Sequence, residues 1–179
     1  MMMSPGLRKF ALTVHITSSV GWMGAVIAYL VLDLTVVASQ DAQTVRAAYV
    51  AMDLIVSKAI VPLALAALLT GLIMSLGTKW GLFRHYWVLI SLLLTVLAVV
   101  VLLIETQTIS RLTDIAANPT TSDGDLRALP GTLVHSVGGT VVLLVIQALN
   151  IYKPQGLTPY GWRKQREQRM ARQSEDAAT

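Results

Sequence analysis

The chain has 179 residues, of which 54% are hydrophobic and only 13% are charged, and its mean hydropathy is +0.62. Soluble domains of this size carry about 25% charged residues, so the composition excludes an ordinary soluble domain and indicates an integral membrane protein. The absence of cysteine excludes disulfides and cysteine-ligated zinc or iron–sulfur sites. The net charge is +4. The positions of the basic residues along the chain indicate which kind of partner this charge suits.

Four apolar stretches are long enough to cross a bilayer, which needs about 20 mostly apolar residues per helix. They cover residues 10–37, 54–76, 86–104 and 133–151. Together they predict an all-α fold, an integral membrane four-helix bundle over residues 1–153, followed by a tail over residues 154–179.

The connections between these stretches carry their own expectations. Residues 106–132 contain Pro, Ser, Asp and Gly and predict an outer loop, in which a short amphipathic turn around residues 109–116 lies at the surface. Pro62 predicts a kink in the first turns of the second span, or a position just inside its start.

The distribution of charge predicts the orientation in the membrane. Ten of the fourteen Lys and Arg residues fall on the side that holds both termini, and seven of the ten acidic residues fall on the other side. The ten basic residues are Arg8, Lys9, Lys79, Arg84, Lys153, Arg163, Lys164, Arg166, Arg169 and Arg172. Because basic residues stay in the cytoplasm, both termini are predicted to be cytoplasmic, and the charge indicates a membrane surface rather than nucleic acid.

The tail predicts a short basic helix in the cytoplasm, over residues 161–173. One interpretation places it against anionic lipid headgroups. The other is a solvated, frayed end of the chain.

One face of the first span is polar. Its members fall at spacings of three, four and seven residues, and they are His15, Ser18, Ser19, Trp22, Tyr29 and Asp33. A polar side chain inside a membrane normally faces protein or a cavity, so this stripe is predicted to face the interior of the bundle.

Depth divides the polar side chains of the four spans into two groups. The outer group contains Asp33, Lys58, Glu105 and His135, and the inner group contains His15, Thr70, Ser75, His85, Gln147 and Asn150. Within the outer group, His135, Asp33 and Glu105 suit a metal or a proton, and imidazole with carboxylate favours zinc or copper(II). The alternatives are interfacial helix ends, an ion pair of Lys58 with Asp33 or Glu105, and a hydrogen bond from His135 to another helix.

The segment His15-Ile-Thr-Ser-Ser-Val-Gly-Trp22-Met-Gly24 resembles a first-helix signature of small bacterial membrane proteins. Over residues 8–153 the chain is similar to an uncharacterised bacterial family of small predicted integral membrane proteins. The pattern of His15, Trp22 and Gly24 also resembles the heme-containing membrane protoporphyrinogen oxidase family and the copper-resistance D family. This resemblance implies a multi-pass protein of the bacterial cytoplasmic membrane, with His15 in a heme or metal site.

Heme b is physically compatible with such a bundle, because a porphyrin fits between helices with His as an axial ligand. His15 and His135 enter from opposite ends and differ in depth by about 18 Å, so one heme cannot join them. His15 can instead pair with His85, or act with Met23, Met74 or an open position. The binding site predicted for heme therefore contains His15, Trp22 and His85.

Three functions follow as hypotheses. The first is a heme-b-binding redox or oxidase-like protein. The second is a non-catalytic membrane scaffold or accessory subunit, acting with a partner subunit or as a homo-oligomer. The third is a small transporter that handles metal ions or protons, with Asp33, Lys58, Glu105 and His135 around its outer vestibule. The sequence leaves open whether the protein is an enzyme.

Overall fold

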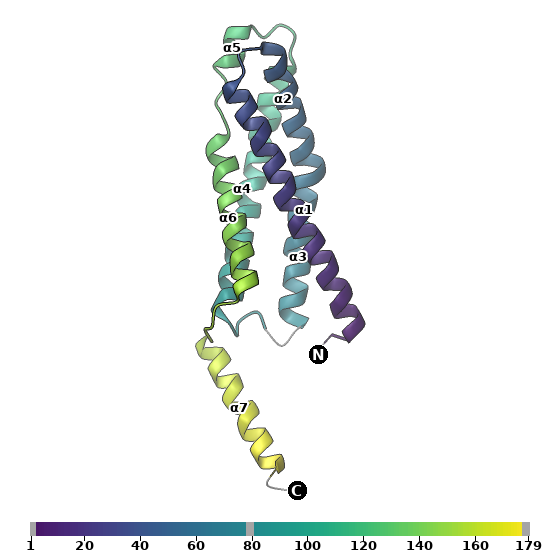
Figure 1. Ribbon diagram of the computed structural model, residues 1–179, viewed down its shortest axis with the longest axis vertical. Coiled ribbons are helices and arrows are strands. Elements are labelled where there is room, and N and C mark those ends of the chain that lie inside the picture. Colours follow the sequence, from purple (N-terminus) through teal and green to yellow (C-terminus); the bar gives the residue numbers. More distant parts are fainter. Residues whose placement is uncertain (1–2, 78–80, 177–179) are drawn as a thin grey trace.

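The fold was analysed in a computed structural model that describes residues 3–77 and 81–176, so the predicted cytoplasmic Lys79 lies outside the described residues. Every element in the described part is a helix (Figure 1). In chain order the elements are α1 (Pro5–Ala38), α2 (Ala42–Ile55), the π-helix η1 (Val56–Ile60), α3 (Val61–Gly77), α4 (Tyr86–Ala117), α5 (Asp123–Arg127), α6 (Leu133–Tyr152) and α7 (Pro159–Asp176).

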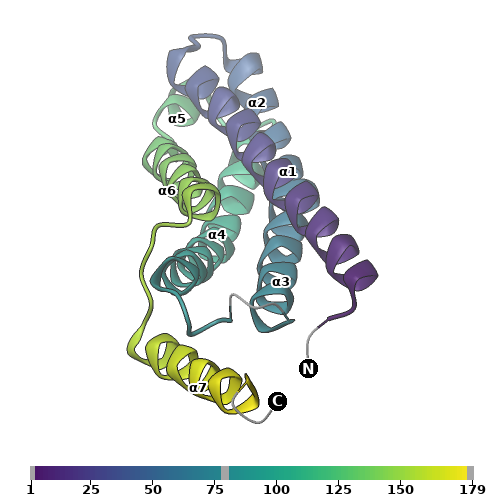
Figure 2. The same ribbon diagram turned by 60° about the horizontal axis from the view of Figure 1, so that its bottom comes forward.

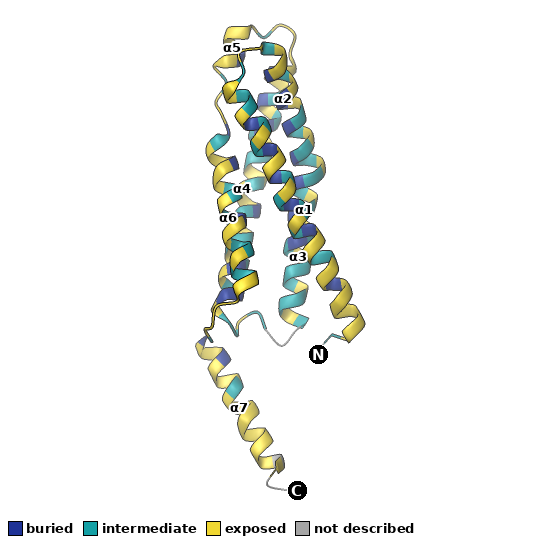
Figure 3. Ribbon diagram, viewed as in Figure 1, coloured by how far each residue is buried: buried dark blue, intermediate teal, exposed yellow. Residues whose placement is uncertain are grey.

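Four helices are long and apolar enough to cross a membrane: α1, the continuous helix of α2, η1 and α3, then α4, and α6. The all-α fold and the four candidate spans are therefore confirmed. α1 packs against α3 and α6, and α4 packs against the same two helices. Exposed residues lie along the outward faces of the four helices (Figure 3), and many of them are large and apolar, including Val20, Leu69, Leu93 and Leu144. This is the surface that a surrounding hydrocarbon phase requires.

Both ends of the described chain lie at the same end of the molecule (Figure 1). The beginning of α1, the connection from α3 to α4, and α7 gather there, and we call it the termini end. Figure 2 shows α1 and α3 separated from α4 and α6 at this end, with α7 below them. The opposite end is formed by α2, α5 and the last part of α4.

At the end opposite the termini, the helices extend beyond the bounds of the predicted spans. The second long helix begins at Ala42 rather than near residue 54, and α4 continues to Ala117 rather than ending near residue 104. The predicted loop over 106–132 is therefore wrong in its first part, and the predicted surface turn at 109–116 is a continuation of α4. We call this packed region, made of α2, α5 and residues 105–117 of α4, the cap.

The hydrophobic core of the bundle continues into the cap. Ile109, Leu112 and Ala116 are buried at helical spacing along α4, and α2 packs against this part of the chain. The most deeply buried residues of α2 are Tyr49 and Met52, which are 1% and 0% exposed. The apolar face of the segment predicted as a surface turn is therefore covered by protein.

Polar contacts satisfy backbone groups at the start of α2 and at the end of α4. The Asp41 side chain accepts hydrogen bonds from the Thr44 hydroxyl at 2.6 Å and from the Thr44 and Gln43 amides. These bonds lower the pKa of the Asp41 carboxyl, the Thr44 hydroxyl most strongly. The Arg46 guanidinium donates to the carbonyls of Ala116 and Asn118, at 2.6 and 2.9 Å, and so satisfies orphan carbonyls at the end of α4.

The irregularity predicted from Pro62 is the π-helix η1. Pro62 has no N–H to donate to the carbonyl of Lys58, and its ring would crowd that carbonyl in a regular α-helix. The wider turn over Val56–Ile60 accommodates this within a helix that is continuous from Ala42 to Gly77. Pro62 therefore lies in the middle of a helix rather than just inside its start.

The first turn of α7 is docked on the segment before α4. Thr158 donates its hydroxyl to the carbonyl of Phe83 and its amide to the carbonyl of Arg84. Its hydroxyl also accepts from the amide of Gly161 at 3.1 Å. The side of Gly161 faces the Arg84 carbonyl so closely that a Cβ there would overlap the carbonyl oxygen.

We expect Gly161→Ala to release α7 from this docking site. Overpacking of this kind costs about 1–3 kcal/mol, whereas helix propensity alone predicts that alanine would be stabilising. Faster tryptic cleavage within α7 would report the release. Gly156→Ala is the matched control, because its Cβ would meet only Tyr86 Cδ2 at an ordinary 3.6 Å. Equal cleavage rates for the two variants would contradict the docking.

Candidate functional site

The polar stripe of α1 faces the neighbouring helices, as its spacing predicts. Ser18, Trp22, Tyr29 and Asp33 are all buried, and His15 is partly buried. Towards the termini end this stripe faces α3 through His15. Towards the cap it faces α6 through Tyr29 and Asp33.

The His15 ring lies against α3. Its Nδ1 atom is 3.1 Å from the carbonyl oxygen of Ala67 and 3.0 Å from the hydroxyl oxygen of Thr70. The absence of a side chain at Gly71 makes room for the ring, since a Cβ there would lie 3.1 Å from His15 Cε1. Of these three contacts, only Thr70 was singled out from the sequence.

The hydrogen bonds of His15 determine which ring nitrogen carries the proton. The Thr70 hydroxyl donates to the carbonyl of Ala66 at 2.6 Å, so it accepts from His15. The carbonyl of Ala67 also only accepts. Nδ1 is therefore the protonated donor, and Nε2 of the neutral ring carries a lone pair that no described residue engages. A backbone carbonyl on Nδ1 commonly orients a ligating histidine in this way.

His15 lines a cavity of about 550 Å³ between the termini-end halves of the four long helices. We call it the His15 cavity. Most of its wall is apolar, and it includes Trp22, Met23, Met74 and Trp87. Its rim includes the exposed side chains of Leu12, Ile16, Val20 and Ile151. It therefore opens between α1 and α6.

Several polar groups lie in the wall of the His15 cavity. Ser91 is 6% exposed, and its buried hydroxyl has no hydrogen-bond partner among the described residues. The amides of Gln147 and Asn150 and the side chain of Lys153 also line the cavity, all near the end of α6. Sequence reasoning placed Gln147 and Asn150 at this depth and missed Ser91 as a candidate for contact with a ligand, because a serine in an apolar helix usually bonds its own backbone.

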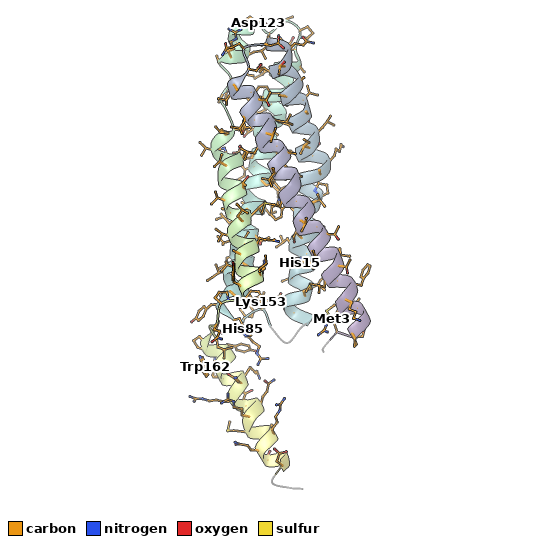
Figure 4. The ribbon with its side chains drawn as sticks, in the orientation of Figure 1. Met3, His15, His85, Asp123, Lys153 and Trp162 are labelled. Carbon is orange, nitrogen blue, oxygen red and sulfur yellow. The ribbon has the colours of Figure 1, made fainter. Side chains whose placement is uncertain are left out.

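His85 does not share this cavity with His15. His85 is the N-cap residue of α4, and its backbone pairs with that of Leu157. The centroid of its ring lies 6.4 Å from the ring centroid of Trp87. Figure 4 places His85 at the foot of the molecule, where α7 begins, and His15 within the helices. The two histidines were predicted at similar depth, but depth does not specify the direction of a side chain around its helix.

Two hydrogen bonds join α1 to the beginning of α6. The Tyr29 and Thr132 hydroxyls are 2.9 Å apart, and the Ser136 hydroxyl donates to Asp33 Oδ2 at 2.6 Å. α1 and α6 run in opposite directions (Figure 1), so Tyr29, the residue farther from the cap on α1, bonds Thr132, the residue nearer the cap on α6. Sequence reasoning missed Thr132 and Ser136, because their spacing does not reveal which side chain of α1 each one bonds.

The predicted outer site is gathered only in part. His135 Nε2 lies 3.4 Å from Glu105 Oε1, while Asp33 is 1% exposed and bonded to Ser136. Within residues 3–77 and 81–176, no group of three or more His, Asp or Glu side chains could hold a metal ion. In the same part of the chain, the exposed Lys58 forms no ion pair with Asp33 or Glu105.

His135 and Glu105 line a second cavity, of about 250 Å³, which we call the His135 cavity. Its wall is contributed by α1, η1, α4 and α6. Trp22 and Leu143 line both cavities and therefore lie between them. The stripe of α1 thus borders two separate spaces.

Comparison with known proteins assigns no family to the chain. No family model matches it, and no curated protein or solved structure is significantly similar to it. The geometry of the two cavities is therefore the main indication of what the protein binds.

We expect Ser136→Ala to destabilise the protein by about 1–3 kcal/mol, because it leaves the buried Asp33 carboxyl without its donor. Thermal or denaturant unfolding in detergent, followed by circular dichroism, would measure the loss. Ser57→Ala is the control, since the Ser57 hydroxyl bonds only Leu54 in the preceding turn. A Ser136→Ala variant as stable as the control would show that the bond contributes nothing.

Proposed function

We propose that this chain is a membrane-embedded heme-b-binding protein in which His15 Nε2 would bind the heme iron. The observation that carries the proposal is the hydrogen-bonded orientation of His15 at the wall of a large apolar cavity. Heme would supply one-electron redox chemistry there, and the chain's own residues would bind and orient it. The resemblance of the His15–Trp22–Gly24 segment to the heme-containing membrane protoporphyrinogen oxidase family supports the same assignment.

The residues of the His15 cavity fit a porphyrin in three respects. The cavity provides about 550 Å³ of space with a mainly apolar wall, as expected for the site of a large cofactor. Ser91 offers a buried, unpartnered hydroxyl. The amides of Gln147 and Asn150 and the ammonium of Lys153 lie together near the end of α6, where they would suit two carboxylates.

The second axial position has fewer candidates. His85 lies outside the cavity wall, which argues against a pair of histidine ligands. Met23 and Met74 line the cavity, so a thioether sulfur or an open position are the remaining choices. His15 alone is therefore the proposed protein ligand on which the binding test depends.

We further propose that the four long helices form the transmembrane bundle, with both termini in the cytoplasm of a bacterium. The basic residues of the termini end support this orientation through the positive-inside rule. At about 3.6 residues per turn, the five basic residues of α7 surround the helix instead of marking one face. Any contact with anionic headgroups would therefore be electrostatic and would begin near Lys153 and the docked first turn, without an apolar face buried in lipid.

The purified protein in detergent is expected to show a Soret band, because bound heme absorbs strongly there. His15→Ala is expected to lose the band by removing the axial nitrogen. His85→Ala and His135→Ala are matched controls and should keep it, since neither side chain lines the His15 cavity. A well-folded, colourless wild type would refute heme binding and favour a scaffold or accessory subunit.

Thr70→Val is expected to weaken heme binding about 10- to 100-fold while leaving the ligand in place. The substitution removes one acceptor of the His15 Nδ1 proton, and such supporting bonds have effects of this size. Heme titration of the apoprotein would measure the affinity. Thr13→Val is the control, because the Thr13 hydroxyl is exposed and bonds Lys9 of its own helix. Unchanged affinity in Thr70→Val would argue against His15 as the ligand.

The proposed orientation is tested by labelling single cysteines, since the chain has none of its own. A membrane-impermeant thiol reagent applied to intact cells should label Asp123→Cys in the cap and spare Gln173→Cys in α7. The reverse pattern would overturn the N-in, C-in orientation.

A further inference from the structure

We propose that the His135 cavity is a second ligand site, one that takes the ring of a lipid-soluble hydroquinone. The site is separate from the His15 cavity, because Trp22 and Leu143 lie between the two. The proposal concerns binding alone, and it rests on the membrane location of the four helices rather than on heme.

The route of entry determines the solubility of the ligand. The rim of the cavity carries Leu97 and Val101 of α4 and Val134 of α6, which are 57%, 41% and 82% exposed. The cavity therefore opens between α4 and α6 on the surface that faces hydrocarbon. A ligand that enters there must dissolve in lipid.

The side chains around the cavity favour a neutral ligand. No lysine or arginine of the described residues lines the wall, and Lys58 of η1 is not part of it. The Glu105 carboxyl from α4 already faces the His135 ring from α6 at 3.4 Å. From α1, the Tyr29 hydroxyl is shared with Thr132 and the Asp33 carboxyl accepts from Ser136. The cavity therefore offers no fixed cation to hold an anionic headgroup.

The shape of the cavity favours a ring. Gly138 and Gly139 of α6 both line it, and a Cβ added at either position meets nothing within 4 Å. A flat group can therefore lie against the backbone of α6. The space of about 250 Å³ is just below the range of about 300–1,000 Å³ for drug-sized ligands, so it suits a ring system whose alkyl tail stays outside.

The polar edge of the cavity favours a phenolic hydroxyl. The His135 side chain is 51% exposed, and its Nε2 faces the Glu105 carboxylate, which leaves Nδ1 to accept a hydrogen bond. An imidazole oriented by a carboxylate is an arrangement suited to accepting a proton. A phenolic hydroxyl is a better proton donor than an alcohol, so a hydroquinone can donate a hydrogen bond to His135 Nδ1. A lipid alkyl chain has no group that could make this bond.

The test measures the binding of a short-chain alkyl hydroquinone to the protein in phosphatidylcholine nanodiscs, with empty nanodiscs subtracted. The probe's dimethyl ether keeps the ring and chain but has no hydroxyl. The wild type is expected to bind the hydroquinone about tenfold more tightly than the ether, which is the effect of roughly one hydrogen bond. His135→Ala should remove this difference. Equal wild-type affinities for the two probes would overturn the proposal.

A pair of glycine variants tests the location. Gly139→Leu is expected to abolish binding by filling the cavity. Gly24→Leu should bind as the wild type does, because Gly24 also has open space around it but lines neither cavity. Hydroquinone binding that survives Gly139→Leu would place the ligand elsewhere and refute the site. The His15→Ala variant should still bind the hydroquinone, so failure of the heme proposal and failure of this one are distinguishable.

Discussion

The arrangement of the helices depends on the need to satisfy the polar face of α1 within the protein. Hydrocarbon offers no hydrogen-bond partners, so polar groups inside a membrane normally find partners within the protein. His15 finds the Ala67 carbonyl on α3, and Asp33 finds Ser136 on α6. α1 is therefore joined to both of its neighbours, near one end to α3 and near the other to α6.

This division of contacts explains why the larger cavity lies where it does. The hydrogen bonds of Tyr29 and Asp33 to Thr132 and Ser136 join α1 to α6 near the cap. Towards the termini end α1 follows α3, and α6 stays with α4 (Figure 2). The space between the two pairs is the His15 cavity, and Trp22 closes it on the side of the cap. A ligand bound there would fill the space between α1 and α6 and would contact both helices.

The cap holds the helices together in the half of the molecule that lies away from the termini end. α2 and the end of α4 bury side chains such as Met52 and Ile109, which are 0% and 2% exposed. Polar contacts tie the same helices together, including the bond from Ser110 to Asp53 at 2.8 Å. Glu105 lies at the start of this tied region of α4, so the position of its carboxylate relative to α6 is set by the packing of the cap. The helices that form the site around His135 therefore contact protein in the cap and face hydrocarbon elsewhere.

Hydropathy and helical spacing were enough to predict the four spans and the interior face of α1. These features follow from length, periodicity and depth, which are all properties of the chain itself. The cap was not predictable in the same way, because hydropathy separates lipid from water and does not recognise an apolar stripe that is covered by another helix. The separation of His85 from His15, the hydrogen bonds of Ser136 and Thr132, and the two cavities were decided only by the tertiary structure. Each of these depends on the direction in which a side chain points around its helix and on which helix lies opposite, and helix packing alone sets both.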